Sequence, residues 1–147
     1  MLSEKFLMRL KHSSGVTVLT GAGISAESGV PTFRGKDGLW ENHKVEELAT
    51  IDAFQKDPAQ FWKFYNWRRN ALKEVKPNLG HYALVDFERI YPEFHLITQN
   101  VDGLHNTAGN KNVVELHGNI MRDKCSDCGD INSEINMELS EPPKCTK

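Results

Sequence analysis

Hydrophobic residues along the chain fall into two kinds of segment, short β-branched runs and longer stretches with helical spacing. Residues 16–20, 94–98 and 113–116 are apolar runs rich in Val, Ile, Leu and Thr, which is typical of buried parallel strands. The pattern therefore predicts an α/β fold built on a parallel sheet.

Two of the helical stretches carry clear start signals. Asp57 and Pro58 fit the N-cap and first position of a helix over residues 58–72. Asn78 fits the N-cap of a second helix over residues 79–90, which ends where Tyr-Pro follows. Both helices precede the strand at 94–98, as a crossover connection requires.

Two further segments have shorter helical patterns. Residues 45–54 show helical spacing in short pieces, and residues 1–10 predict an amphipathic first helix. The residues expected on the inward face of this first helix are Leu2, Phe6, Leu7 and Leu10.

A glycine turn follows the first strand directly. Gly21, Gly23 and Ala26 fit the spacing G-x-G-x-x-[G/A], which lets a backbone approach a pyrophosphate at the start of a helix. The spacing alone is a weak signal, because glycine turns often serve packing only. The remainder of residues 21–40 is rich in Gly, Ser and Pro and predicts a loop.

Polar residues gather where the second and third strands end. Gln99, Asn100 and Asp102 follow the strand at 94–98, and His117 follows the strand at 113–116. Parallel sheets bind ligands at the carboxyl ends of their strands, so chemistry is expected at this edge. From residue types alone His117 is either an acid–base residue or a structural histidine.

The sequence leaves two interpretations open for each of two arginines, Arg34 and Arg68. Phe33 and Arg34 form an aromatic and cation pair beside the glycine turn, or else a core plug and a solvated charge. Arg68 shares a helix face with Phe61, Phe64, Tyr65 and Leu72 by i, i+3, i+4 spacing. Burial of an unpaired charge costs several kcal/mol. Arg68 therefore either extends to solvent or meets an anion.

The C-terminal segment predicts a metal site. Cys125 and Cys128 form a C-x-x-C hook, and Cys145 follows at a distance in the range of a zinc ribbon. Three thiolates cannot close a structural zinc site, so either the fourth ligand lies beyond Lys147, or water takes the fourth position, or the hook holds no metal. Unpaired free cysteines are the less favoured interpretation.

Composition narrows the class of protein. The 147 residues suffice for one domain with a small appendage, and a net charge of −2 gives no reason to expect a nucleic-acid-binding protein. No apolar run has transmembrane length, and the N-terminus lacks a secretory h-region. The odd cysteine count suits metal better than disulfides, and together these features predict a cytoplasmic protein.

In sequence order, these motifs resemble those of the sirtuins, the NAD-dependent protein lysine deacylases. The matching stretches are Gly-Ala-Gly-Ile-Ser at 21–25, Gly-Val-Pro-Thr-Phe-Arg at 29–34, Thr-Gln-Asn-Val-Asp-Gly-Leu-His at 98–105, Glu-Leu-His-Gly at 115–118, and the three cysteines. The resemblance implies a Rossmann-like doubly wound parallel sheet, of which the chain supplies an incomplete first half. It places this NAD-binding part at residues 1–120 with a helical insertion at about 36–80. A partial zinc-ribbon module follows at 121–147.

The resemblance also implies roles for individual residues. His117 is expected to be the general base, and Asp102 is expected to read the nicotinamide carboxamide. NAD⁺ is the implied co-substrate, Zn²⁺ the implied structural metal, and acyl-lysine proteins or peptides the implied partners. The residues expected to contact NAD⁺ are Gly21, Ala22, Gly23, Ser25, Glu27, Pro31, Thr32, Phe33, Arg34, Trp40, Gln99, Asn100, Val101 and Asp102.

One departure from the common sirtuin pattern bears on the acyl group. Many sirtuins have an aspartate before the Phe-Arg pair, whereas this chain has Thr32. That feature resembles the branch that removes succinyl, malonyl and glutaryl groups. In that branch a Tyr and an Arg three residues apart hold the acyl carboxylate, which Tyr65 and Arg68 match.

The resemblance excludes ordinary dehydrogenase chemistry and leaves three functional hypotheses. No acidic residue ends a second strand about 20 residues after the glycine turn, as a hydride-transfer enzyme needs. NAD⁺ is therefore expected to be cleaved at its glycosidic bond. The chain is expected to be the N-terminal portion of a deacylase. The alternatives are a non-catalytic NAD- or zinc-binding fragment and a mono-ADP-ribosyltransferase.

Overall fold

The computed structural model describes residues 3–30, 39–40, 43–44 and 48–147. The chain divides into two compact units. The first comprises Met1–Gly29 with Lys76–Asn119, and the second comprises Val30–Val75 with Ile120–Lys147. The parallel sheet belongs to the first unit and the cysteines to the second.

The first unit is organised around the predicted parallel sheet, which the structure confirms. Strands β1 (Gly15–Thr20), β4 (Glu93–Thr98) and β5 (Val113–Glu115) pair in the order β1-β4-β5, and both pairings are parallel. The register aligns Thr20 with Thr98 and Thr98 with Glu115. Residues that follow the three strands therefore leave the sheet along one edge.

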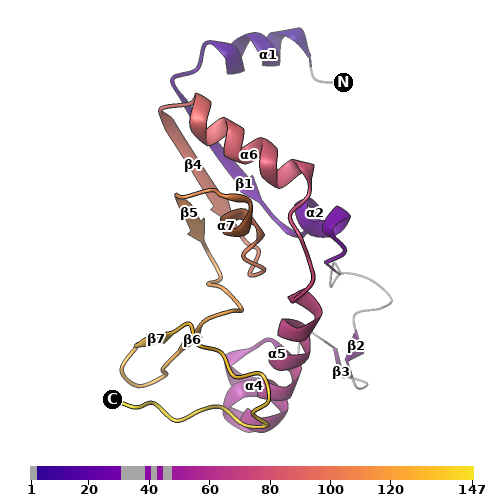
Figure 1. Ribbon diagram of the computed structural model, residues 1–147, viewed down its shortest axis with the longest axis vertical. Coiled ribbons are helices and arrows are strands. Elements are labelled where there is room, and N and C mark those ends of the chain that lie inside the picture. The colour runs from indigo at the N-terminus through magenta and orange to yellow at the C-terminus, as the bar shows by residue number, and fades with distance from the viewer. Residues whose placement is uncertain (1–2, 31–38, 41–42, 45–47) are drawn as a thin grey trace. The chain divides into compact units, whose positions relative to one another are not determined.

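Helix α6 (Leu79–Ile90) covers one face of this sheet, as Figure 1 shows. Its bounds match the prediction, because Asn78 caps it as expected. The Asn78 side chain accepts a hydrogen bond from the Gly80 N–H at 2.9 Å. Val85 of the helix is buried together with Phe94 and Leu96 of β4, and these side chains form the core of the unit.

A single carboxylate fixes the connection that leads into β5. Helix α7 (Leu104–Ala108) ends at Gly109, and Glu88 of α6 accepts hydrogen bonds from the turn that follows. The donors are the side chain of Asn110 and the backbone N–H groups of Lys111 and Asn112. Partial burial raises the pKa of Glu88, but these donors outweigh it and lower the pKa overall.

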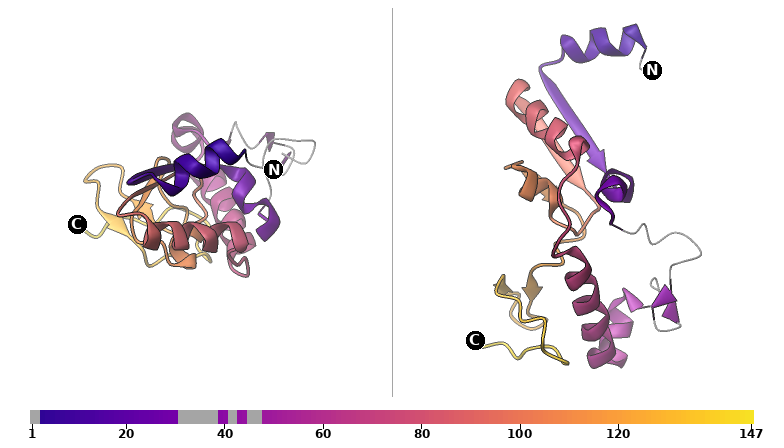
Figure 2. Two further views of the ribbon diagram at one scale, coloured as in Figure 1. Left: turned by 90° about the horizontal axis from the view of Figure 1, so that it is seen from above. Right: turned by 45° about the vertical axis from the view of Figure 1, so that its right-hand side comes forward.

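Helix α1 (Glu4–Lys11) forms where predicted, but its expected burial is wrong. Phe6 and Leu7 are each 48% exposed, and Leu10 is half-buried, whereas Leu2 lies outside the described residues. In Figures 1 and 2 the helix extends from the start of β1 and does not lie across a face of the sheet. Its apolar face therefore does not pack on the sheet that the described strands form.

The second unit is built on two consecutive helices. Helix α4 (Ile51–Lys56) leads into α5 (Pro58–Leu72), whose bounds match the prediction. Asp57 accepts a hydrogen bond from the Gln60 N–H at 2.9 Å, which confirms the predicted cap. Phe54 and Phe61 meet edge-on at 5.2 Å between ring centroids and join the two helices. Of the predicted 45–54 pattern, residues 51–54 lie in α4, and residues 45–47 lie outside the described residues.

Short antiparallel pairs complete the second unit. β2 (Leu39–Trp40) pairs with β3 (His43–Lys44), and β6 (Asp123–Lys124) pairs with β7 (Ile131–Asn132). The β6–β7 hairpin carries the C-x-x-C hook in its loop. Within the part of the chain that the structure describes, no helix is both long and apolar enough to cross a membrane.

Candidate functional site

The glycine turn after β1 leads into a helix start, as the G-x-G-x-x-[G/A] spacing predicts, although the remainder of residues 21–40 was expected to be a loop. Helix α2 (Ala22–Ser25) and the 3₁₀ turn η1 (Ala26–Ser28) follow at once, and Gly29 ends them with φ 85°. Because α2 has only four residues, its attraction for an anion comes from the N–H groups of its first turn and not from a long dipole.

The two glycines of this turn leave open space beside the backbone. Gly21 has φ −141°, and Gly23 is not among the glycines with positive φ, so neither needs glycine for its conformation. A Cβ added at either position meets no described atom within 4 Å. Packing does not require glycine there either. The open space fits a ligand that lies directly on the backbone, as a pyrophosphate does.

Ser25 is the centre of the polar cluster at the sheet edge. Its side chain is fully buried, and its hydroxyl donates to Asp102 Oδ2 at 2.7 Å. Asn100 Nδ2 donates to the same hydroxyl oxygen at 3.0 Å. The structure therefore brings together three of the residues predicted to contact NAD⁺, from segments separated by more than seventy residues.

A buried histidine supports Ser25 from α6. His81 Nδ1 accepts the backbone N–H of Asn78 at 3.3 Å, which places the proton of the neutral ring on Nε2. Nε2 lies 3.5 Å from Ser25 Oγ and so points its proton at the hydroxyl. Burial lowers the pKa of His81, and nearby Asp102 only partly opposes this effect. The ring is therefore a neutral donor.

A second buried histidine lies behind the first. The rings of His81 and His105 are 4.9 Å apart between centroids, and His105 Nε2 lies 2.9 Å from Thr20 Oγ1. Burial, with a smaller contribution from His81, lowers the pKa of His105 to about 4 even though Asp102 acts to raise it. The Nδ1 atom of His105 has no hydrogen-bond partner among the residues that the structure describes. Both imidazoles are neutral near pH 7.

Sequence reasoning placed neither of these histidines in the site. His105 stands inside a matching motif, and His81 occupies the third position of the helix that Asn78 caps. Their burial depends on contacts that span 56 and 85 residues of sequence. The capping position of His81 was the one local signal that pointed toward Ser25.

Other predicted cofactor residues lie at the same edge with fewer contacts. The Gln99 N–H donates to the carbonyl oxygen of Thr20 at 3.0 Å, and its side chain is exposed. Val101 is half-buried, Glu27 is exposed, and Ala22 is exposed in the first turn of α2. Pro31, Thr32, Phe33 and Arg34 lie outside the described residues, as does the side chain of Trp40.

His117 follows the end of β5 and is exposed. Gly118 turns the chain there with φ 72°, and its N–H donates to the carbonyl oxygen of Glu115 at 3.2 Å. The imidazole is therefore accessible at the carboxyl end of the sheet, as an acid–base residue must be.

The second unit carries the predicted Tyr and Arg pair on α5. The guanidinium carbon of Arg68 lies 5.6 Å from the centroid of the Tyr65 ring and 5.7 Å from that of Phe64. Desolvation lowers the pKa of Arg68 and Tyr65 partly offsets this, but the group stays charged near pH 7. A phenol and a guanidinium side by side can bind a carboxylate.

The three cysteines converge in the same unit. Their sulfur atoms all lie within 4.8 Å of one another, and those of Cys128 and Cys145 are 3.6 Å apart. A disulfide holds sulfurs about 2.05 Å apart. Tetrahedral zinc with bonds of about 2.3 Å separates them by about 3.8 Å. The spacing therefore fits three ligands of one zinc ion, which leaves one position for a fourth.

The chemistry of the donor set agrees with metal binding. Backbone N–H groups of Cys128 and Asp127 point at the Cys125 sulfur, and the other two thiols lie beside it. Together these donors lower the pKa of Cys125 to about 7. A thiolate is the form that binds zinc.

Comparison with protein families matches residues 21–147 to the model described as "Sir2 family". A protein of Aquifex aeolicus (strain VF5) named "NAD-dependent protein deacylase" is 55% identical over 133 residues, which are 90% of this chain and 56% of that protein. "NAD-dependent protein deacylase 1" of Archaeoglobus fulgidus is 46% identical over 147 residues, 99% of this chain and 60% of that protein.

Solved structures agree with the sequence relatives. A structure described as "Crystal structure of a Sir2 homolog-NAD complex" superposes with a TM-score of 0.90 at 45% identity, over 100% of this chain and 58% of that one. Another, "Structural Basis for the Mechanism and Regulation of Sir2 Enzymes", gives 0.77 at 42% identity, over 97% and 58%. The chain spans just over half the length of the relatives that it matches.

Proposed function

This chain belongs to the Sir2 family, and we propose that it forms the N-terminal part of an NAD-dependent protein lysine deacylase. The observation that carries the proposal is the Ser25 cluster with Asn100 and Asp102, which lies beyond the carboxyl ends of the strands. The uncovered glycine turn beside it suits a dinucleotide, and matched relatives are named for this activity.

We assign the chain's own residues to roles on this basis. The backbone of Ala22 and Gly23 contacts the pyrophosphate, and Asn100 and Asp102 hold the nicotinamide carboxamide through donor and acceptor groups. His117 takes a proton from a ribose hydroxyl as general base. When bound, NAD⁺ supplies the ADP-ribosyl group that accepts the acyl group from lysine, with release of nicotinamide. The partners are acyl-lysine proteins or peptides.

The finer proposal concerns the acyl group. We infer a preference for succinyl and malonyl groups, because the charged Arg68 lies against Tyr65 on α5 and can pair with a carboxylate. A hydrogen bond to a charged group contributes about 1.5–3 kcal/mol. Loss of this interaction corresponds to roughly 10- to 100-fold in kcat/KM.

Arg68→Met in the full-length gene product tests the proposed acyl preference, and the same assay measures the proposed deacylase activity. Nicotinamide release is measured with acetyl-lysine and succinyl-lysine peptides, and Arg89→Met, which removes an exposed arginine, serves as control. We expect a fall of roughly 10-fold or more on succinyl-lysine and less than about 3-fold on acetyl-lysine. Equal losses on both substrates would contradict the carboxylate pairing.

The activity itself has separate tests. His117→Ala should abolish steady-state deacylation of the acyl-lysine peptide. Retained deacylation would exclude His117 as the general base. Transfer of labelled ADP-ribose to protein in place of deacylation would identify a mono-ADP-ribosyltransferase. Absence of turnover with NAD⁺ binding intact would identify a binding protein.

A further inference from the structure

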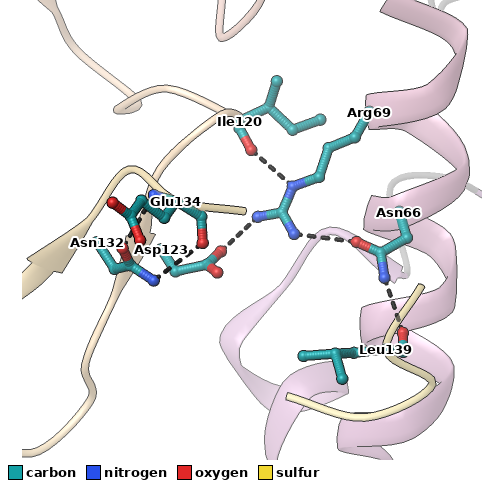
Figure 3. A network of polar contacts seen from close by, with 7 residues as sticks. All are labelled: Asn66, Arg69, Ile120, Asp123, Asn132, Glu134 and Leu139. Carbon is teal, nitrogen blue, oxygen red and sulfur yellow. Dashed lines mark hydrogen bonds and ion pairs between the residues drawn. The ribbon is translucent and has the colours of Figure 1, made fainter. Parts of the chain in front are cut away.

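Arg69, next to the proposed acyl-binding residue Arg68, is a buried charge with several polar partners. Arg69 is 3% exposed, and Figure 3 shows its guanidinium at the centre of a polar network. Nε donates to the carbonyl oxygen of Ile120 at 2.8 Å, and Nη1 donates to Asn66 Oδ1 at 3.0 Å. Nη2 forms an ion pair with Asp123.

These contacts attach α5 to both segments that carry the cysteines. Ile120 and Asp123 precede Cys125, with Asp123 at the start of β6. Asn66 donates from Nδ2 to the carbonyl oxygen of Leu139, in the segment that leads to Cys145. Arg69 therefore fixes one segment and Asn66 the other, and the two side chains bond to each other.

The geometry requires an arginine. Three acceptors lie in different directions around one planar group, and the guanidinium carbon also lies 4.9 Å from the centroid of the Trp62 ring. A lysine ammonium lacks the planar fork that donates to acceptors in these directions. Removal of the arginine alone is strongly destabilising, because it leaves the Asp123 carboxylate without its partner.

The anchoring residues directly follow the acyl-binding residues in sequence. Asn66 follows Tyr65, and Arg69 follows Arg68. The pair Asn66 and Arg69 therefore lies about 100° around the axis of α5 from the pair Tyr65 and Arg68. A rotation of about 20° moves an atom about 6 Å from the helix axis by about 2 Å. Hydrogen bonds tolerate about 0.5 Å, so the rotation of α5 decides whether Tyr65 and Arg68 meet a carboxylate together.

We propose that Arg69, with Asn66, is a positioning residue for acidic acyl groups. The pair fixes the rotation of α5 against the cysteine-bearing segments and so sets the direction of Tyr65 and Arg68. The inference rests on the proposed acyl preference. A neutral acetyl group presents no carboxylate, so its turnover depends far less on this rotation.

The test is Arg69→Met in the full-length gene product, with Arg89→Met as the matched control. We expect kcat/KM for succinyl-lysine to fall roughly 10-fold or more, while that for acetyl-lysine falls less than about 3-fold and KM for NAD⁺ stays unchanged. Equal losses on the two acyl groups would overturn the positioning role. Arg89→Met should change neither value.

A second variant separates positioning from stability. Arg69→Met with Asp123→Leu removes both charges, so the unpaired carboxylate of the single variant is gone and thermal stability should recover. Selectivity should stay low, because the fixed contacts to Ile120 and Asn66 are still absent. Recovery of selectivity together with stability would overturn the inference.

The failures of the two proposals are distinguishable. If the unmodified protein removes succinyl groups no better than the Arg68→Met variant does, the carboxylate pairing fails and this inference fails with it. If Arg68→Met lowers selectivity but Arg69→Met does not, only the positioning role is overturned.

Discussion

The pKa of His105 predicts that the first unit loses stability on mild acidification. The side chain is 2% exposed, and burial is the main reason that its pKa falls to about 4. Two neighbours also act on it: His81 of α6 lowers the pKa, and Asp102, three residues before His105, raises it. In the unfolded chain the imidazole is solvated and has its ordinary pKa of about 6.5.

The sign and size of the effect follow from proton linkage. Between about pH 6.5 and about pH 4 the unfolded chain binds the proton that the folded chain excludes. The contribution is therefore fully present above about pH 6.5 and is lost as the pH falls toward about 4. With these two pKa values the free energy of unfolding drops by about 2 kcal/mol between about pH 7 and about pH 5. The lowered pKa of His81 adds an effect of the same sign.

Urea unfolding of the full-length gene product at pH 7, 6 and 5 measures this loss. His105→Gln keeps an amide that can bond to Thr20 Oγ1 but does not titrate, so its stability should fall by about 2 kcal/mol less over the same range. His95→Gln replaces an exposed histidine of β4 and serves as control. If His105→Gln retains the full pH dependence, or if the imidazole titrates by NMR above about pH 6, the reasoning is refuted.

Two further predictions concern the hydroxyl at the cluster's centre and the thiols. Ser25→Ala leaves His81 Nε2 without its acceptor and Asp102 Oδ2 without its donor, so we expect a loss of about 1–3 kcal/mol in stability and a KM for NAD⁺ raised about 10-fold. Unchanged values, matching an exposed Ser14→Ala control, would contradict this. Cys128→Ser should lower the zinc content measured by a chromophoric chelator, whereas Ser126→Ala should not. Equal zinc content in both variants would exclude Cys128 as a ligand.

The elements that could be predicted from sequence are those whose signals are local. Helices α5 and α6 begin and end at the predicted residues because Asp57 and Asn78 bond to N–H groups within three residues of themselves. The strands were found within one residue at each end, since β-branched runs mark them directly. Burial of α1 could not be read in the same way, because its apolar spacing shows a face but not what that face meets.

The residues of the candidate site also fall into those that sequence signals identified and those that only the folded structure brings into the site. Ser25, Asn100 and Asp102 were found through family motifs, and their contacts across 75 and 77 residues follow from the parallel register that aligns the strand ends. His81 and His105 were missed because their roles arise only when α6 and α7 bring their rings to 4.9 Å. Sequence spacing predicts which edge of the sheet a residue reaches, but not which buried side chain contacts it there.

The two adjacent arginines of α5 show why a helical face alone cannot assign a buried charge. Periodicity placed Arg68 among apolar residues and left its neighbour unremarked, yet Arg69 is the more buried of the two. Its burial is possible because three acceptors come from Asn66, Ile120 and Asp123, two of them more than fifty residues away. A charged side chain can be buried where hydrogen-bond acceptors from distant parts of the sequence surround it. Those acceptors mark Arg69 as the anchoring cation of α5, whereas Arg68, beside the Tyr65 ring, is the cation that we propose for a ligand carboxylate.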